Sequence, residues 1–351
     1  MDSEVPAVSP AQLLMHESLG RIVTMTCLRS IIELRLYDLV PETGTVSLTQ
    51  LAKSSNASEE ILIRLLRPLL ASGIFASPRP REYIHTPGSI GFRQPAIRAA
   101  FLHGFDETLP CFLVQHRWLA DNGWKSPELP DNCPFSMTHG GDSLFGHLEQ
   151  NPEKAEVFNR DQEMEFIGIV GVYPFGQELK WSGPEDVLVD VGGGKGQASL
   201  ALTKAYPELH KRVVLQDQAP VLKSVEHEVQ AVVKEMRAYN FFDPQPVKGA
   251  AFYYLRRILC DWPDKACKII LQNQAEAMDS HSRLLIAAFV VPEVGCDFLT
   301  AASDAVMMTY AGKERTEAQF RQLLESVGLC LTKVWQTPGE LQAVLEARLS
   351  W

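Results

Sequence analysis

The sequence contains no CxxC pair, no uncharged apolar run long enough to cross a membrane, and no excess of basic residues. Its seven cysteines are an odd number and lie far apart, which disfavours a disulfide framework or a zinc site and predicts free thiols in a reducing cytosol. Lysine and arginine total 33 against 43 aspartates and glutamates, a net charge of −10, whereas a generic nucleic-acid binder carries a basic surface. The N-terminus is acidic and lacks the apolar segment of a signal peptide. These absences predict a cytoplasmic protein that binds no metal, membrane or nucleic acid.

Length and composition predict two domains. A chain of 351 residues exceeds the usual size of one domain, and 46% hydrophobic with 22% charged residues is typical of a globular protein. The composition changes near residues 181–184. We therefore expect a helical domain over residues 1–178 and a second domain over residues 179–351.

The first domain begins with a long helical pattern. Residues 10–39 carry apolar side chains on more than one helical face, which is typical of a helix that pairs with a partner chain. The pattern favours a homodimer, and its alternative is a buried core helix of a monomer.

Residues 47–87 have the pattern of a winged helix-turn-helix. Ser58 is suited to cap a second short helix, Gly73 to end it, and a turn then leads into an extended segment at 83–85. Such a module often binds DNA, but here the chain is acidic and the second helix offers only two arginines. A dimerisation and substrate-lid module is the favoured interpretation.

The second domain alternates apolar strand patterns with helical segments, which predicts a parallel sheet covered on both faces. Its last two strands face each other across a Pro-Gly pair, like a terminal antiparallel hairpin. The expected strands are 187–192, 212–218, 250–259, 283–291, 329–337 and 340–349, and the expected helices are 197–206, 219–230, 265–279 and 316–327. Ligands of such sheets bind beyond the carboxyl ends of the strands.

The motif DVGGGKGQ begins at Asp190, directly after the first strand. Its glycines at 192, 194 and 196 allow a tight turn and a close approach to a ligand. The dinucleotide fingerprint needs glycine or alanine where Gln197 stands, and a P-loop needs serine or threonine after Lys195. The spacing instead suits S-adenosylmethionine (SAM), which carries no phosphate.

Further residues extend this cofactor site. Asp217 ends the second strand about 20 residues after the loop, where a carboxylate accepts hydrogen bonds from ribose hydroxyls. Asn240 and Phe241 follow the third strand region, where they are suited to contact the edge and the ring of adenine.

Four blocks in order resemble fungal and plant O-methyltransferases of the caffeic-acid type: LVDVGGGKGQ, VVLQDQAPVL, PQPVKGAAFYYLRRILCDWPDKAC and AGKERTEAQFRQLL. The resemblance covers essentially the whole chain. It implies a SAM-dependent class I methyltransferase fold, with a Rossmann-like sheet, preceded by a winged-helix dimerisation domain, and a homodimer that binds SAM or S-adenosylhomocysteine (SAH). It also implies that the cofactor is lined by Asp190, Gly192, Gly194, Asp217, Gln218, Asn240, Phe241 and Arg256. Family members usually have aspartate where Asn240 stands.

The catalytic motif departs from the family. The family reads L-H-D-W, in which the histidine is the general base, and this chain reads Leu-Cys-Asp-Trp with Cys260 and Asp261. Of the two glutamates that orient the histidine, one position is Ala288 and the other is Glu314. A base tuned near neutral pH contributes about 10²–10⁴ in rate when a phenol must lose its proton. Neighbouring carboxylates would raise the pKa of Cys260, so the thiol is a poor replacement.

Other residues are candidates for the missing base or for the substrate pocket. The lid domain contains three histidines, each more often structural than catalytic: His103, His116 and His139. Apolar pocket walls are expected, with plain core packing as the alternative, at Phe135, Met137, Phe158, Met164, Phe166, Met307 and Met308. Such walls suit an apolar, aromatic or polyketide-like substrate.

Three functions remain open. The favoured one is a SAM-binding pericyclase like the leporin-type fungal subgroup, which lacks the methyl-transfer base and catalyses dehydration, Diels–Alder, Alder-ene or retro-Claisen steps. There Arg256 or Arg257 would polarise a carbonyl and Asp261 would hold a hydroxyl. The second is a methyltransferase acting on an acidic hydroxyl, and the third is a non-catalytic sensor, scaffold or DNA-binding regulator.

Overall fold

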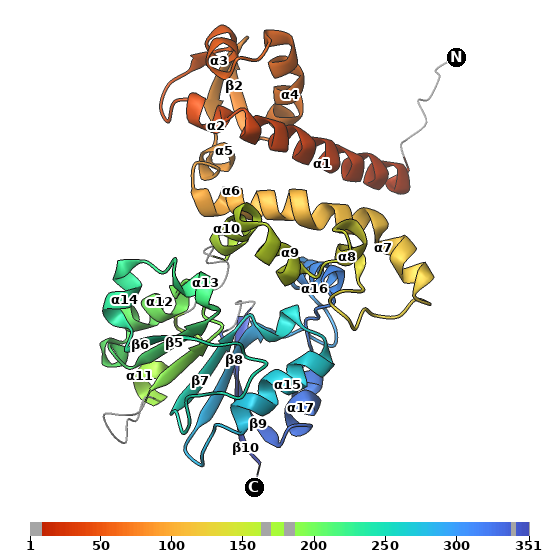
Figure 1. Cartoon of the computed structure of the whole chain (residues 1–351). Helices are drawn as coiled ribbons and strands as arrows, with labels where there is room; N and C mark the ends of the chain where they lie inside the picture. The colour runs from red at the N-terminus through yellow and green to blue at the C-terminus, as the bar shows by residue number, and fades with distance from the viewer. Residues whose placement is uncertain (1–8, 163–169, 179–186, 338–341, 351) are drawn as a thin grey trace. The chain divides into compact units, whose positions relative to one another are not determined.

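The computed structural model describes residues 9–162, 170–178, 187–337 and 342–350 (Figure 1). Contacts divide the chain into two compact units: unit 1 is 1–107 with 156–164, and unit 2 is 108–155 with 165–351. Residues 108–155 thus group with the second unit, whereas the sequence predicts a boundary at 178/179. That boundary stays a prediction, because it adjoins residues 179–186, which lie outside the described ranges.

Unit 1 contains a long helix, a three-stranded sheet and short helices. The sheet order is β1-β3-β2, with antiparallel pairs. The elements are α1 Pro10–Glu33, α2 Leu36–Leu39, β1 Val46–Ser47, α3 Leu48–Ser55, α4 Glu59–Ala71, β2 Phe75–Arg79, β3 Glu82–His85, α5 Pro87–Gly91 and α6 Pro95–Leu102. A π-helical turn, His103–Thr108, follows at the edge of the unit.

The winged-helix pattern is borne out by local chemistry. Ser58 caps α4 by accepting the Ile61 N–H at 3.3 Å, and Gly73 takes φ +74° just after the helix. The predicted helix over 10–39 divides at Arg35, whose φ of +53° is left-handed.

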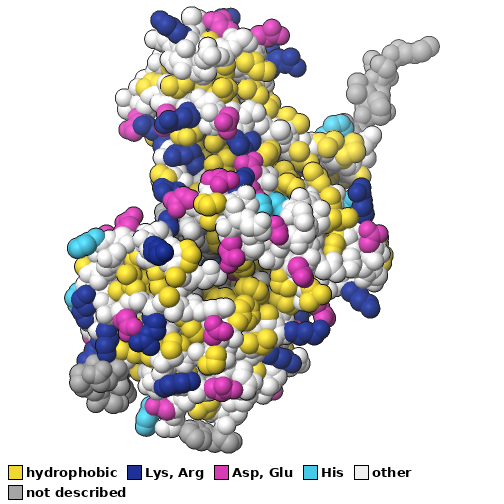
Figure 2. Space-filling view, viewed as in Figure 1, with side chains coloured by type: hydrophobic (Ala, Val, Ile, Leu, Met, Phe, Trp, Pro, Cys, Tyr) yellow, Lys and Arg dark blue, Asp and Glu magenta, His cyan; other side chains and the backbone are white. Residues whose placement is uncertain are grey.

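The first half of α1 exposes its apolar side chains (Figure 2). Leu14 is 66% exposed, and burial begins only at Leu28. The row comprises Leu13, Leu14, Met15, Leu19, Ile22 and Val23. The buried-helix alternative is therefore wrong for this half, which leaves a surface suited to a partner chain.

Unit 2 is built on a seven-stranded sheet with the order β6-β5-β4-β7-β8-β10-β9 (Figure 1). The strands β6, β5, β4, β7 and β8 run parallel, and β10 pairs antiparallel with both β8 and β9. The strands are β4 Leu188–Val191, β5 Val213–Asp217, β6 Glu235–Ala238, β7 Phe252–Arg256, β8 Arg283–Phe289, β9 Leu329–Gln336 and β10 Gln342–Leu349. The parallel sheet and the terminal hairpin are confirmed.

Helices cover both faces of this sheet. Residues of α15 and α17 pack with one set of strand side chains, and residues of α12 and α14 pack with the other. The helices are α7 Leu109–Asp121, α8 Pro134–Thr138, α9 Leu144–Gln150, α10 Pro152–Asp161, α11 Phe175–Glu178, α12 Gln197–Ala205, α13 Ala219–Leu222, α14 His227–Val232, α15 Asp264–Ala275, α16 Phe298–Thr309 and α17 Glu317–Glu325. The division between the two units falls within α10. Two 3₁₀ turns lie at Pro207–Leu209 and Leu259–Asp261. Within the described residues, no helix is both long and apolar enough to span a bilayer.

Candidate active site

The glycine loop after β4 is packed tightly against the protein. A Cβ atom added at Gly192 would lie 2.6 Å from Ile258 Cδ1, and one added at Gly196 would lie 2.5 Å from Val229 Cγ1. Both glycines also have left-handed φ values, of +68° and +85°. Only glycine fits at these points, so the loop backbone can approach a ligand closely.

Asp190 lies beneath this loop, with 1% of its surface exposed. Its Oδ2 accepts the Ser199 hydroxyl at 2.6 Å, and a Cβ atom on Gly193 would come within 2.6 Å of its carboxyl carbon. Burial raises the pKa of Asp190 to about 6, although the Ser199 hydrogen bond and the Arg256 charge oppose the rise. Asp190 thus supports the loop from below.

Asp217, at the end of β5, joins the loop from the side. Its Oδ2 accepts the Gly194 N–H at 2.8 Å and its Oδ1 accepts the Gln218 N–H at 2.7 Å. Burial raises the pKa of Asp217, and these two hydrogen bonds oppose the rise. Each carboxylate oxygen can accept a further hydrogen bond, so the pair of oxygens fits two ribose hydroxyls.

The segment after β6 brings an amide and an aromatic ring to the same place. Asn240 is exposed, and its Oδ1 accepts the Phe242 N–H at 3.1 Å. The Phe241 ring lies 3.5 Å from the position of a Cβ atom on Gly192, and 5.9 Å from the centre of the Trp262 ring. A glycine cradle, a carboxylate and an aromatic ring with a neighbouring amide are the parts that a SAM-type nucleoside needs.

Replacing Asp217 with asparagine is expected to weaken SAH binding roughly 10- to 100-fold, because charge-assisted hydrogen bonds to the ribose would be lost. Isothermal titration calorimetry measures this. Glu208→Gln removes the same charge at an exposed position, so it serves as the matched control. Equal affinity of Asp217→Asn and the wild type would contradict a ribose contact.

The Leu259–Asp261 turn carries the altered base motif. Cys260 Sγ lies 3.6 Å from Asp261 Oδ1. Burial first, and then the charges of Asp261 and Glu314, raise the pKa of the Cys260 thiol well above its ordinary value, although the Arg257 charge opposes them. Burial also raises the pKa of Asp261 to about 6. Cys260 therefore stays protonated near neutral pH and cannot serve as the base.

Glu314 is brought beside this turn by the backbone. The Lys313 N–H donates to the Cys260 carbonyl at 2.7 Å, and a Cβ atom on Gly312 would clash with that carbonyl at 2.2 Å. Cys260, Asp261 and Glu314 thus lie close together in unit 2, and the Arg257 charge is near enough to lower the pKa of each.

The Glu314 carboxyl is held at one oxygen only. Oε1 accepts the Ser303 hydroxyl at 2.8 Å, and the backbone N–H donates to Asp304 at 3.0 Å. Oε2 is buried and has no hydrogen-bond partner among the described residues. Burial raises the pKa of Glu314 to about 7, against the opposing effects of Ser303 and the Arg257 charge. The sequence missed Ser303 and Asp304, because it assigned no helix where α16 lies.

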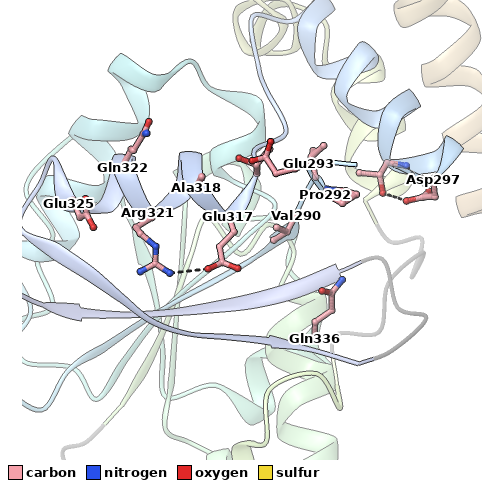
Figure 3. Close-up of a pocket in the computed structure, with 13 residues that line it drawn as sticks. Val290, Pro292, Glu293, Asp297, Glu317, Ala318, Arg321, Gln322, Glu325 and Gln336 are labelled. Atoms are coloured by element: carbon pink, nitrogen blue, oxygen red, sulfur yellow. Dashed lines mark hydrogen bonds and ion pairs between the residues drawn. The ribbon is translucent and has the colours of Figure 1, made fainter. Parts of the chain in front are cut away.

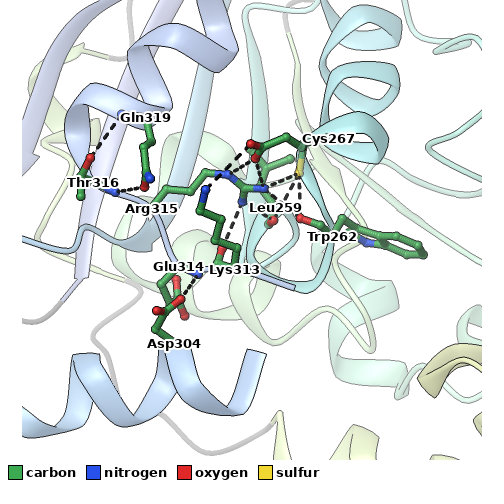
Figure 4. Close-up of polar contacts among 10 residues, drawn as sticks. Leu259, Trp262, Cys267, Asp304, Lys313, Glu314, Arg315, Thr316 and Gln319 are labelled. Carbon is green, nitrogen blue, oxygen red and sulfur yellow. Dashed lines mark hydrogen bonds and ion pairs between the residues drawn. The ribbon is translucent and has the colours of Figure 1, made fainter. Parts of the chain in front are cut away.

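Arg315, which was also missed, ties the two segments together (Figure 4). The side chain is 1% exposed and forms an ion pair with Asp264 at 2.8 Å. It also donates to three backbone carbonyls, at 2.7 to 3.1 Å, of Leu259, Lys313 and Trp262. The sequence feature that could have pointed to Arg315 is its place in AGKERT, directly after Glu314. The structure buries this arginine.

Some of the expected pocket residues lie together in unit 2. Phe135 stacks on His139 with ring centres 3.8 Å apart, and it meets Tyr310 edge-on at 5.4 Å. Met307 is buried and Met308 is half-buried on α16. Tyr310 is an aromatic member of this group that the sequence did not single out.

The other expected residues belong to unit 1, are exposed on unit 2, or lie outside the described residues. His103 and Phe158 belong to unit 1, where their rings pack edge to face at 5.2 Å. Met137 is 42% exposed, and His116 lies on an exposed face of α7 because its side chain points away from the buried Cys111 and Trp118. Met164 and Phe166 lie outside the described residues.

A separate hollow of about 660 Å³ lies between the loop after β8, α17 and the end of β9 (Figure 3). Arg321 and Glu317 on its wall pair with each other at 2.9 Å. None of the residues predicted for the cofactor or the substrate lines this hollow.

Comparison with known proteins identifies the family of the chain. The sequence profile of the O-methyltransferase domain matches residues 119–330, and that of the O-methyltransferase dimerisation domain matches residues 16–92. The chain belongs to the O-methyltransferase family. O-methyltransferase kntB of Aspergillus niger is 35% identical over 339 residues, which cover 94% of this chain and 82% of that protein.

Two solved structures share the fold. OxaC aligns with a TM-score of 0.89 and 31% identity over 97% of this chain and 88% of that chain, and it has been solved with SAH and oxaline. LepI in complex with SAM aligns with a TM-score of 0.89 and 28% identity over 97% of this chain and 90% of that chain. The expected family, its methyltransferase fold and its SAM-type cofactor are therefore confirmed.

Proposed function

We propose that the chain is a SAM-binding enzyme of secondary metabolism that rearranges or dehydrates a polyketide-type intermediate without transferring a methyl group. The observation that carries this proposal is the state of the former base position. Cys260 is a buried thiol that keeps its proton, and the second orienting position is Ala288, 4% exposed in β8. A pericyclic or dehydrative step tolerates the loss of a strong base, whereas methylation of an ordinary phenol does not.

The remaining groups suit hydrogen-bond donation to a substrate carbonyl. Near neutral pH a substantial fraction of Glu314 is protonated, and its Oε2 is uncommitted. Ser303 holds the other oxygen, so the donor is oriented before the substrate binds. The nearby Arg257 charge would stabilise negative charge that develops on the substrate oxygen. Preorganised donors of this kind each contribute about 10²–10³ in rate.

The cofactor would be held by the glycine loop, Asp217, Asn240 and Phe241. When bound, SAM supplies a fixed positive charge at its sulfonium centre. The apolar side chains of Phe135 and Met307 would exclude water from the substrate, which strengthens each electrostatic contact in the site.

The test uses extract from a producing strain in which the gene for this chain is deleted, so that its substrate accumulates. Purified protein is added with methyl-labelled SAM, and products are followed by mass spectrometry and radioactivity. We expect the accumulated compound to become an isomer, or a product lighter by one water, that carries no label. A labelled product heavier by one methylene, with release of SAH, would overturn the proposal.

Sinefungin provides a sharp control, because it carries a positive charge at the corresponding place and cannot donate a methyl group. Conversion with sinefungin in place of SAM supports the proposal, and loss of conversion supports methylation. Glu317→Gln changes an exposed carboxyl three residues from Glu314, and it should convert as the wild type does.

Methyl transfer to an acidic hydroxyl is the second candidate. Two observations favour it: the pKa of Glu314, raised to about 7, suits a general base, and kntB and other relatives are named O-methyltransferases. An enol or carboxylic acid would need little help in losing its proton.

We further propose that the chain acts as a cytoplasmic homodimer. The exposed apolar row on the first half of α1 and the match to the dimerisation domain over residues 16–92 support this assembly.

A further inference from the structure

Three buried glutamines form a hydrogen-bonded ladder inside unit 2. Gln216 lies on β5, Gln245 follows β6, and Gln274 lies on α15. All three are 0% exposed. Gln216 and Gln245 exchange two hydrogen bonds, at 2.8 and 2.9 Å. Gln245 Nε2 donates again to Gln274 Oε1 at 2.9 Å.

Gln245 uses its full hydrogen-bonding capacity. Its nitrogen donates twice, and its oxygen accepts from Gln216 and from the Val247 N–H at 3.1 Å. Apolar side chains would fill the same space without any pairing requirement. Hydrogen bonds are directional, so a fully paired buried amide fixes the geometry of the chain around it, which apolar packing would not do.

The segment that the ladder holds carries Asn240 and Phe241. Gln274 Nε2 donates to the Tyr239 hydroxyl at 3.3 Å, and that hydroxyl donates to the Asp243 carbonyl at 2.8 Å. These bonds close the backbone around residues 240–242. On the same helix as Gln274, Asn273 Nδ2 donates to the Phe241 carbonyl at 3.0 Å.

The other end of the ladder reaches the glycine loop. The backbone carbonyl of Gln216 accepts the Gly193 N–H at 3.0 Å, and the next residue is Asp217. One residue of β5 therefore connects the loop and the ribose carboxylate, through its backbone, with the segment of Asn240, through its side chain.

We propose that the glutamine ladder is a positioning element that sets the preference of the cofactor site for adenine. The inference rests on the proposed function, in which the glycine loop, Asp217, Asn240 and Phe241 hold SAM, and extends it to the recognition of the adenine ring. Asn240 Oδ1 already accepts the Phe242 N–H, so the amide nitrogen of Asn240 is the group left to donate to a ligand. Adenine offers an acceptor at N1, whereas hypoxanthine carries a proton there and presents a donor. The held orientation of Asn240 thus favours adenine.

The experiment compares the binding of SAH and of S-inosylhomocysteine, its hypoxanthine counterpart, by isothermal titration calorimetry. The variants are Gln274→Met and Tyr239→Phe, each of which breaks the link between the ladder and residues 240–242. We expect the preference of the wild type for SAH to fall about tenfold in each variant, since one oriented hydrogen bond contributes about that much. Tyr173→Phe is the matched control, because this buried tyrosine bonds Arg283 at 2.9 Å in the other core cluster.

The readouts separate positioning from stability. All three variants should lower the unfolding temperature, but only the two ladder variants should lower the base preference. An unchanged preference in Gln274→Met and Tyr239→Phe would overturn the inference. If both fail to fold, Asn273→Ala, at a position 9% exposed, applies the same test to the Phe241 carbonyl. Failure of the wild type to bind SAH would overturn the proposed function itself, together with this inference.

Discussion

Turnover by the wild-type chain is expected to fall as the pH rises through about 7, the value to which burial raises the pKa of Glu314. The protonated fraction of such a group drops from roughly 90% one unit below its pKa to roughly 10% one unit above it. A carboxyl that donates a hydrogen bond to the substrate loses its function over this range. A carboxylate that accepts a proton during methylation gains function over the same range. The direction of the pH profile of the initial rate therefore separates the two candidate functions.

Glu314→Gln sharpens this result. Glutamine still donates a hydrogen bond but does not titrate, so in the proposed function the fall of the rate near pH 7 disappears. The rate itself falls roughly 10- to 100-fold, because an amide is a weaker donor than a carboxylic acid. If Glu314 is the base, glutamine cannot take the proton, and the loss reaches about 10²–10⁴-fold. Glu317→Gln should keep both the rate and the pH profile. A Glu314→Gln variant with an unchanged profile would show that another group titrates.

Arg315→Met is expected to destabilise the fold by about 3–5 kcal/mol, because it leaves three backbone carbonyls without their donor, at a cost of about 1–3 kcal/mol for each buried group. The free energy of unfolding, from urea denaturation followed by fluorescence, measures this effect. Turnover should fall as well, since Arg315 joins the Cys260 turn to the segment of Glu314.

Two variants serve as references for Arg315→Met. Arg321→Met breaks an exposed ion pair with Glu317 on α17 and a single hydrogen bond, at 3.3 Å, to the Leu331 carbonyl, and it should cost about 1 kcal/mol. Arg315→Lys keeps the charge but not the planar fork, so it should recover only part of the stability. Equal stability of Arg315→Met and Arg321→Met would contradict the role of Arg315 in holding the Leu259–Asp261 turn and the Glu314 segment together.

Short-range patterns located the glycine loop and Asp217, because each follows directly from its strand. The hydrogen bond from the Gly194 N–H to Asp217 shows that the two segments meet. The binding of the cofactor by these residues stays a prediction. The sequence places a strand region before Asn240 but gives it no bounds, because Glu235–Ala238, the strand β6, is short and polar and lies at an edge where only β5 pairs with it. The helix expected over 219–230 is broken into α13 and α14 between Leu222 and His227.

The catalytic side shows where sequence reasoning ends. The loss of the histidine at Cys260 could be seen in the motif itself. That Glu314 retains an uncommitted oxygen, with Ser303 on the other, depends on α16, which comes from a different part of the chain. His116 was a reasonable candidate by type, but the rotation of α7 exposes it.

The amino-acid sequence alone determined the family, the parallel sheet with its terminal hairpin, the glycine loop and the absence of the usual base, because each of these is written in residues close together along the chain. The tertiary structure decided which distant side chains meet. The glutamine ladder, the Arg315 hydrogen bonds and the Ser303–Glu314 contact each join separate segments, and their chemistry arises only when burial removes water and leaves these groups to one another.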